Sequence, residues 1–298
     1  MTFTGVYTAL ATPFRNGILD TDSFERLIET QVVAGVAGIV PVGTTGESPT
    51  LSHSEHQEVI RLAVQFAAGR CQVIAGTGSN STAEAVALTQ GAEKLGADGA
   101  LLVVPYYNKP TQEGVFQHYQ AVSEAVGIPL VLYSIPGRSG IEIGVETTLR
   151  LAEACPNIRC IKEAGGSVER VNQLRAALPE DFVILSGDDS LTLPFLSVGA
   201  CGVISVASNV IPAEIVEMVV AWERGDVRRA TALHQHFYPL FRDLFIESNP
   251  VPIKYALTRK GIIDSSEVRL PLAALSTKSQ RQLEATLART IETQPPAS

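Results

Sequence analysis

Long apolar runs and cysteines are both scarce in this 298-residue sequence. No stretch reaches the roughly 18 apolar residues that a membrane-spanning helix needs. Residues 1–5 have neither the basic start nor the apolar stretch of a secretory signal, so we expect a cytoplasmic protein. The four cysteines form no CxxC pair and no zinc-type spacing. We therefore expect buried free thiols in a reducing compartment and no metal site.

Positive charge is also in the minority. Lys and Arg number 23 against 31 Asp and Glu, which gives a net charge of −8, and no block of like charges occurs. This balance argues against nucleic acid or an anionic membrane as the main partner. The sequence is instead 45% hydrophobic and 18% charged, which is sufficient for a large core. A small anionic substrate is compatible with these values, because one local cation can outweigh a weak overall field.

Eight short apolar runs alternate with amphipathic helical segments as far as about residue 225. They lie at residues 6–11, 38–42, 72–75, 100–104, 130–133, 158–161, 183–185 and 202–206. The runs are continuous, which is typical of parallel strands buried on both faces. This pattern predicts an α/β fold, a (β/α)8 TIM barrel over residues 1–225. A doubly wound open sheet is the alternative, but no GxGxxG follows the first strand.

Capping signals mark several of the helices, and the chain ends differently from the barrel. Asp22 with Glu25, Ser52 with Glu55, and Ser81 with Glu84 each fit a cap followed three residues later by a carboxylate. The region 226–298 contains helical patterns at 226–246, 252–260 and 277–291 with no strand between them. We predict a C-terminal helical extension that packs on the barrel or on another subunit.

The sixth apolar run is followed by a charged pair, Lys162 and Glu163. Active-site residues of TIM barrels gather at the carboxyl ends of the strands. An amine there enters a partly desolvated pocket, which lowers its pKa and leaves a neutral nucleophile able to attack a carbonyl. Lys162 is therefore a candidate Schiff-base residue. The alternatives are a lysine that extends to solvent or an ion pair with Glu163.

Other strand ends carry groups suited to a carboxylate or to proton transfer. Residues 43–47 read Gly-Thr-Thr-Gly-Glu, so backbone N–H groups can approach a ligand and two hydroxyls add donors. Tyr133 ends the fifth strand, and Arg138 follows as a bidentate clamp for a carboxylate. Tyr106 and Tyr107 follow the fourth strand. The alternative for residues 43–47 is a tight turn, and that for Arg138 is an unpartnered surface arginine. The alternative for Tyr106 and Tyr107 is an aromatic rim.

Two pairs of residues remain ambiguous. Asp188 and Asp189 follow the seventh strand, but no further acidic residues or histidines are spaced as ligands, so we expect a helix cap there. His53 and His56 lie near a helix start. They either face solvent or contact a ligand away from the barrel mouth.

Together these motifs resemble one family, the class I pyruvate-dependent lyases and aldolases of the N-acetylneuraminate lyase superfamily, and within it the dihydrodipicolinate synthases. The resemblance covers essentially the whole chain. It rests on residues 43–47, on the spacing of Tyr133, Pro136, Arg138 and Gly140, and on residues 162–163. A threonine at position 44 and the arginine at position 138 favour the synthase over sialic acid lyases. A serine at position 134, where asparagine is more usual, is a departure.

The resemblance implies how pyruvate would be handled. Lys162 would form an imine with its ketone, and no metal or organic cofactor would be needed. Thr45 and the backbone near Ile204 would hold its carboxylate. Tyr133 would act as the general acid and base.

It also implies how the second substrate would be bound. Arg138 would bind the carboxylate of L-aspartate 4-semialdehyde. Thr44 would link Tyr133 to Tyr107, which arrives from the neighbouring subunit. The product would be 4-hydroxy-tetrahydrodipicolinate, in the diaminopimelate route to lysine. The alternatives are a sibling aldolase or dehydratase acting on a sugar acid, and a non-catalytic protein that binds a keto acid.

A second site is implied as well, at which lysine binds at a subunit interface and inhibits. The matching residues are Ser48, His53, His56, Asn80, Glu84 and Tyr106. Pro49 departs from the family pattern. The resemblance further implies a homotetramer built as a dimer of dimers.

Overall fold

The computed structural model describes residues 3–291, and its main feature is a closed barrel of eight parallel strands. Around the barrel the order is β1, β4, β5, β6, β7, β8, β9 and β10, and β10 pairs with β1 to close it. The strands are β1 Gly5–Ala9, β4 Gly38–Val40, β5 Gln72–Gly76, β6 Gly99–Val103, β7 Leu130–Ser134, β8 Ile158–Glu163, β9 Val183–Ser186 and β10 Gly202–Ser205. Each coincides with a predicted run, so the TIM-barrel prediction is confirmed.

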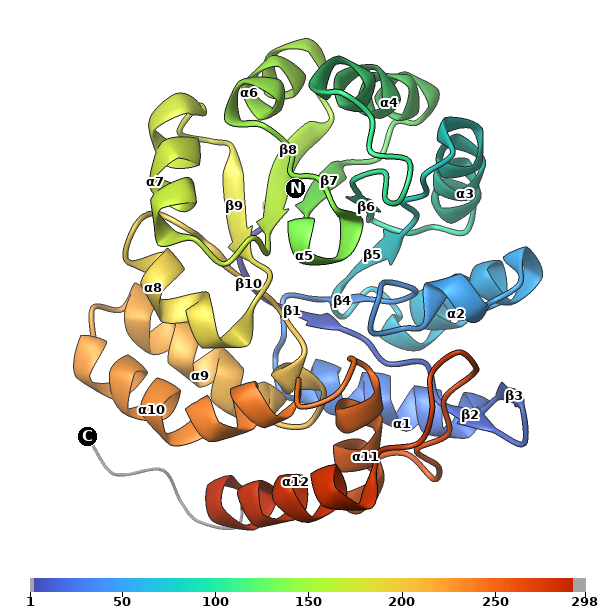
Figure 1. Cartoon of the computed structure of the whole chain (residues 1–298), viewed down its shortest axis with the longest axis vertical. Helices are drawn as coiled ribbons and strands as arrows, with labels where there is room; N and C mark the ends of the chain where they lie inside the picture. The colour runs from blue at the N-terminus through green and yellow to red at the C-terminus, as the bar shows by residue number, and fades with distance from the viewer. Residues whose placement is uncertain (1–2, 292–298) are drawn as a thin grey trace.

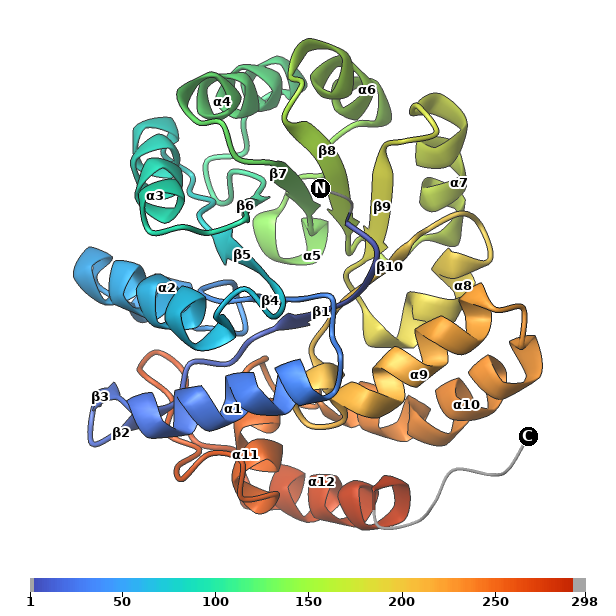
Figure 2. The same ribbon diagram turned by 180° about the vertical axis from the view of Figure 1, so that it is seen from behind.

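Helices form a ring around these strands, as Figures 1 and 2 show from opposite sides. They are α1 Thr21–Val33, α2 His53–Ala67, α3 Thr82–Lys94, α4 Gln112–Ala125, α6 Val145–Ala154, α7 Val168–Ala177, α8 Thr192–Leu196 and α9 Pro212–Glu223. The strands are sandwiched between this ring and the barrel interior, which is why their apolar runs are continuous. Within residues 3–291, no helix is both long enough and apolar enough to cross a membrane.

The predicted caps were right at two helices and wrong at one. Ser52 and Glu55 form a reciprocal capping box at α2, and Ser81 caps α3. The cap of α1 is Asp20, whose side chain accepts a hydrogen bond from the Ser23 backbone, while Asp22 lies within the first turn. The helix begins earlier than predicted because Asp20 has the extended backbone that a cap requires.

One other expectation needs correction, and one element was not predicted. All four cysteines are free, but only Cys155 and Cys160 are buried. Cys71 and Cys201 are half-buried because they immediately precede β5 and β10, at the amino ends of these strands. A small hairpin of β2 Phe14–Arg15 and β3 Ile18–Leu19 was not predicted, although its Asn-Gly turn at residues 16–17 is a known hairpin signal.

After α9 the chain forms helices α10 Val227–Asp243, α11 Val251–Arg259 and α12 Thr277–Thr290, close to the predicted segments. Apolar side chains of α10, including Leu233 and Phe237, belong to the same buried cluster as Val6 and Ile39 of the barrel. The domain boundary at residue 225 therefore stays a prediction. Residues 292–298 of the predicted extension lie outside the described residues.

Candidate active site

Lys162 lies inside the carboxyl end of β8, with 5% of its surface exposed. The register of the neighbouring parallel strands pairs it with Tyr133 of β7. As a result its Nζ lies 4.2 Å from the centroid of the Tyr133 ring. Gly187 leaves room for the amine, because a Cβ there would lie 3.1 Å from Lys162 Cε and 2.6 Å from Ala164 Cβ. The amine and the phenol thus meet at the end of the barrel where catalysis is expected.

Burial lowers the pKa of Lys162 to about 7, because a charged ammonium loses its hydration there. Asp189 and Asp188 oppose this shift, and the positive charge of Arg138 adds to it. A substantial fraction of the amine is therefore neutral near pH 7, the form that attacks carbonyl carbons.

Glu163 does not pair with Lys162, so that alternative is wrong. Its carboxylate lies 2.9 Å from Arg170 Nε and accepts a hydrogen bond from the Gly165 backbone at 2.7 Å. The reason is the two-residue period of a strand, which turns successive side chains to opposite faces. Lys162 faces the site, whereas Glu163 is held behind it by α7.

Tyr133 is 6% exposed, and burial raises the pKa of its phenol to about 12. Arg138 opposes that shift, as does a hydrogen bond with the Thr44 side chain. Arg138 lies on the short helix α5 Pro136–Ser139, which directly follows β7 and lies in front of the strands in Figure 1. Its side chain is exposed and forms no ion pair with the part of the chain that the structure describes. The guanidinium is thus available for an anionic ligand.

Thr45 and Ile204 lie deeper than these groups, with 3% and 1% exposure. The Thr45 hydroxyl accepts a hydrogen bond from Asn249 Nδ2 at 2.9 Å. Neither residue lines the cavity described next, and neither does Lys162.

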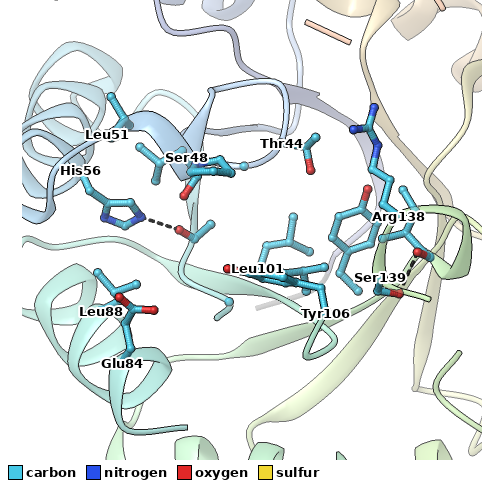
Figure 3. Close-up of a pocket in the computed structure, with 18 of the residues that line it drawn as sticks. Thr44, Ser48, Leu51, His56, Glu84, Leu88, Leu101, Tyr106, Arg138 and Ser139 are labelled. Carbon is cyan, nitrogen blue, oxygen red and sulfur yellow. Dashed lines mark hydrogen bonds between the residues drawn. The ribbon is translucent and has the colours of Figure 1, made fainter. Parts of the chain in front are cut away.

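A cavity of about 410 Å³ opens at the carboxyl ends of the strands (Figure 3). Of the predicted site residues it is lined by Thr44, Ser48, His53, His56, Glu84, Tyr106, Tyr133 and Arg138. Figure 3 shows Thr44 and Arg138 on one side and His56 and Glu84 on the other. Within one chain, Thr44, Tyr133 and Arg138 therefore share a continuous space with most of the candidate lysine-site residues.

The far side of the cavity is built around Glu84. One of its carboxylate oxygens lies 2.8 Å from His53 Nε2, and the other accepts a hydrogen bond from the Ser79 hydroxyl. The Ser79 bond, followed by that to His53, holds the pKa of Glu84 below its ordinary value. His56 Nε2 lies 2.9 Å from the Gly76 carbonyl oxygen, and burial lowers the pKa of this imidazole. A carboxylate and imidazoles facing one cavity form a polar site suited to a cationic ligand.

The loop after β6 carries the tyrosines. Asn80 Nδ2 donates to the Tyr106 carbonyl oxygen at 3.2 Å, which places Asn80 beside Tyr106 but outside the cavity lining. Tyr107 has a left-handed φ of 73° and is 88% exposed. This chain therefore directs Tyr107 outward and does not bring it to Tyr133.

The two aspartates after β9 have different roles, since only Asp188 caps a helix. Asp188 caps the 3-10 helix η2 Asp189–Leu191 by accepting from the Ser190 backbone, as predicted. Asp189 is buried, and its carboxylate accepts from the backbones of Val206 and Ala207 at 3.0 and 2.9 Å. Burial raises its pKa to about 6. Across residues 3–291 no group of three or more His, Cys, Asp or Glu side chains could hold a metal ion.

Sequence reasoning missed two features of this site. The influence of Asp189 on Lys162 depends on the pairing of β8 with β9, which the sequence does not reveal, although an acidic pair after a buried strand was a signal. The ties from Asn249 and Lys254 to residues 43–47 span more than 200 positions. No local pattern indicates such pairs.

Comparison with known proteins agrees with this geometry. A sequence model of the Dihydrodipicolinate synthetase family matches residues 2–290. The 4-hydroxy-tetrahydrodipicolinate synthase of Persephonella marina is 50% identical over 285 residues, covering 96% of this chain and 97% of that protein.

Two solved structures are similar as well. The 4-hydroxy-tetrahydrodipicolinate synthase of Methylacidiphilum fumariolicum is 55% identical, with a TM-score of 0.96 and coverage of 98% of this chain and 97% of that one. A lysine-bound dihydrodipicolinate synthase from Cyanidioschyzon merolae is 44% identical, with a TM-score of 0.94 and coverage of 97% and 98%. The chain therefore belongs to the dihydrodipicolinate synthetase family.

Proposed function

We propose that this chain is a 4-hydroxy-tetrahydrodipicolinate synthase, which condenses pyruvate with L-aspartate 4-semialdehyde in the diaminopimelate route to lysine. The observation that carries the proposal is the buried amine of Lys162, whose pKa is lowered to about 7 and whose Nζ lies against the Tyr133 ring. Family membership supplies the substrate class.

The reaction would begin with the neutral Lys162 amine. It attacks the ketone carbon of pyruvate, and loss of water gives an imine. The imine withdraws electrons from the methyl group, so a proton can leave and an enamine forms. Thr45 and the backbone near Ile204 bind the pyruvate carboxylate, and Tyr133 transfers protons to and from the imine.

The second half would join the two substrates. The enamine carbon attacks the aldehyde carbon of L-aspartate 4-semialdehyde, and the new alkoxide takes a proton through Tyr133, Thr44 and the Tyr107 side chain of a neighbouring subunit. Arg138 binds the carboxylate of this substrate. The substrate amine then adds to the imine carbon, and the bond to Lys162 breaks, which releases the cyclic product and the free enzyme. The side chain of Lys162 itself forms the imine, so the proposal requires no metal or organic cofactor.

Regulation by lysine forms a second part of the proposal. Glu84, His53 and His56 face the cavity together with Ser48 and Tyr106, and Asn80 lies beside Tyr106. These residues suit a zwitterion with a cationic side chain, and the structure from Cyanidioschyzon merolae contains lysine. Inhibition and thermal-shift titrations test this part, and the absence of any response to millimolar lysine would remove it.

The assembly and the location are also proposed. A homotetramer built as a dimer of dimers would bring Tyr107, which is 88% exposed in the single chain, into a neighbouring site. Sedimentation and a Tyr107→Phe variant test this arrangement. We place the enzyme in the cytoplasm, because four unpaired cysteines suit a reducing compartment.

The decisive experiment measures turnover of pyruvate with L-aspartate 4-semialdehyde, coupled to the next reductase of the pathway. Turnover with borohydride trapping of pyruvate on Lys162 is the expected result. Trapping without turnover would overturn the choice of aldehyde and indicate a sibling aldolase acting on a sugar acid. The absence of both trapping and turnover would overturn the catalytic proposal itself.

A further inference from the structure

A buried ion pair joins the loop of residues 43–47 to the C-terminal extension. Lys254 Nζ of α11 lies 2.6 Å from Glu47 Oε1, and the two side chains are 0% and 1% exposed. The other oxygen, Glu47 Oε2, accepts a hydrogen bond from the Arg269 backbone at 2.9 Å. Lys254 Nζ also lies 4.3 Å from the centroid of the Phe14 ring. Both charges are therefore compensated inside the protein, as a buried pair requires.

A second tie joins the start of α11 to the same motif. Asn249 Nδ2 donates to Thr45 Oγ1 at 2.9 Å, and both residues are buried. Asn249 lies two positions before α11 and Lys254 lies within it. One helix start thus contacts the five-residue loop at two places, Thr45 and Glu47.

The loop needs such support. Glu47 has a left-handed φ of 55°, a conformation that is strained for a residue with a side chain. At Gly46 a Cβ would lie 2.9 Å from the Val42 backbone nitrogen, so the loop is folded tightly against the residues that follow β4. A strained backbone conformation that is packed this tightly persists only when the surrounding structure holds it.

We propose that α11 is a positioning element of the active site, which fixes the loop of residues 43–47 through Lys254 and Asn249 so that Thr44 and Thr45 face the reacting pyruvate. The inference rests on the proposed function. It gives the C-terminal extension a part in pyruvate binding, because a small displacement of positioned groups lowers the rate strongly. Neither Lys254 nor Glu47 contacts a reacting atom in this account.

The test compares a neutral double variant with a control on the same helix. Glu47→Gln with Lys254→Met removes both charges, so no unpaired buried charge remains. Asn249→Ala removes the tie to Thr45 alone. Tyr255→Phe is the control, since its hydroxyl donates to Glu284 of α12 at 2.7 Å and not to the loop. KM for each substrate, kcat and thermal unfolding are measured for every variant.

We expect the KM for pyruvate to rise about tenfold in the double variant, and less in Asn249→Ala. The KM for the semialdehyde and the trapping of Lys162 at saturating pyruvate should stay close to wild type. The control should lose thermal stability with no change in KM. An unchanged pyruvate KM in both loop variants, with lowered thermal stability, would show a purely structural tie and overturn the proposal. Wild-type enzyme that fails to trap pyruvate would instead overturn the proposed function.

Discussion

Lys162 and Lys254 are both buried, and both lie over an aromatic ring, yet their surroundings differ in one respect. Lys254 has a carboxylate 2.6 Å away, whereas no ion pair is found for Lys162 among the described residues. Burial lowers the pKa of each amine, and Glu47 opposes this effect at Lys254. The aspartates that favour the charged form of Lys162 act without direct contact.

The comparison shows what a catalytic lysine requires besides burial. The ammonium group of a paired lysine donates a hydrogen bond to a fixed carboxylate, so the amine is not free to attack a carbonyl. An unpaired buried lysine has its pKa lowered into the physiological range and becomes a nucleophile. Among the described residues, the absence of an ion-pair partner therefore distinguishes Lys162, the proposed nucleophile, from Lys254.

The largest effect is expected from Lys162→Met. Turnover and borohydride trapping should fall to background, because the imine cannot form. The variant should also be more stable by up to about 4 kcal/mol at pH 7, since the folded protein no longer contains an amine whose pKa is depressed from 10.5 to about 7.

The stability gain has a defined pH dependence. The penalty is complete below pH 7 and disappears as the pH rises toward 10.5, so the gain should shrink over that window in urea unfolding. Near wild-type turnover in Lys162→Met would refute the mechanism, and an equally stable variant would contradict the assigned burial cost.

The opposite result is expected from Lys254→Met. It leaves Glu47 charged and buried without its cation, which should cost about 3–5 kcal/mol of unfolding free energy. Adding Glu47→Gln should restore much of that loss, because the remaining groups are neutral. Urea unfolding of both variants at equal protein concentration checks this. If the double variant is as unstable as the single one, the loss does not come from an unpaired charge.

A third prediction concerns the pH dependence of imine formation. The rate of trapping by pyruvate should rise with pH around a midpoint of about 7, because only the neutral Lys162 amine attacks the ketone. Single-turnover trapping across pH 5.5–9 (a window of about one and a half to two units on either side) measures it. A midpoint near that of an exposed lysine would contradict the comparison between the two residues.

The smallest effect is expected from Asp189→Asn. The carboxylate of Asp189 favours the charged form of Lys162, so its removal should move the midpoint of imine formation lower by about half a unit to one unit. Asp188→Asn is the matched control, and its shift should be smaller. A midpoint that moves upward would show that Asp189 does not act on the amine through its charge.

Much of this fold could be predicted from local sequence because its causes are local. Continuous apolar runs produce strands buried on both faces, and Ser52 with Glu55 forms a capping box within three positions. The cap of α1 was misplaced because Asp22 has a carboxylate three residues later, Glu25, whereas Asp20 has Ser23 there. The backbone conformation nevertheless makes Asp20 the cap. The position of Lys162 at a strand end could likewise be predicted, since the prediction requires only the strand and its direction.

Local patterns were therefore enough to predict the order of the strands, the carboxyl end at which Lys162, Tyr133 and residues 43–47 gather, and the family. No local pattern predicted which lysine is paired, because the pairing depends on long-range contacts. The pairing of Lys254 with Glu47 spans 207 positions, and Glu163 turns from Lys162 to Arg170. The compensation of Lys254 depends on a distance of 2.6 Å to a segment that is remote in the chain, and the packing of the C-terminal extension against the barrel sets that distance.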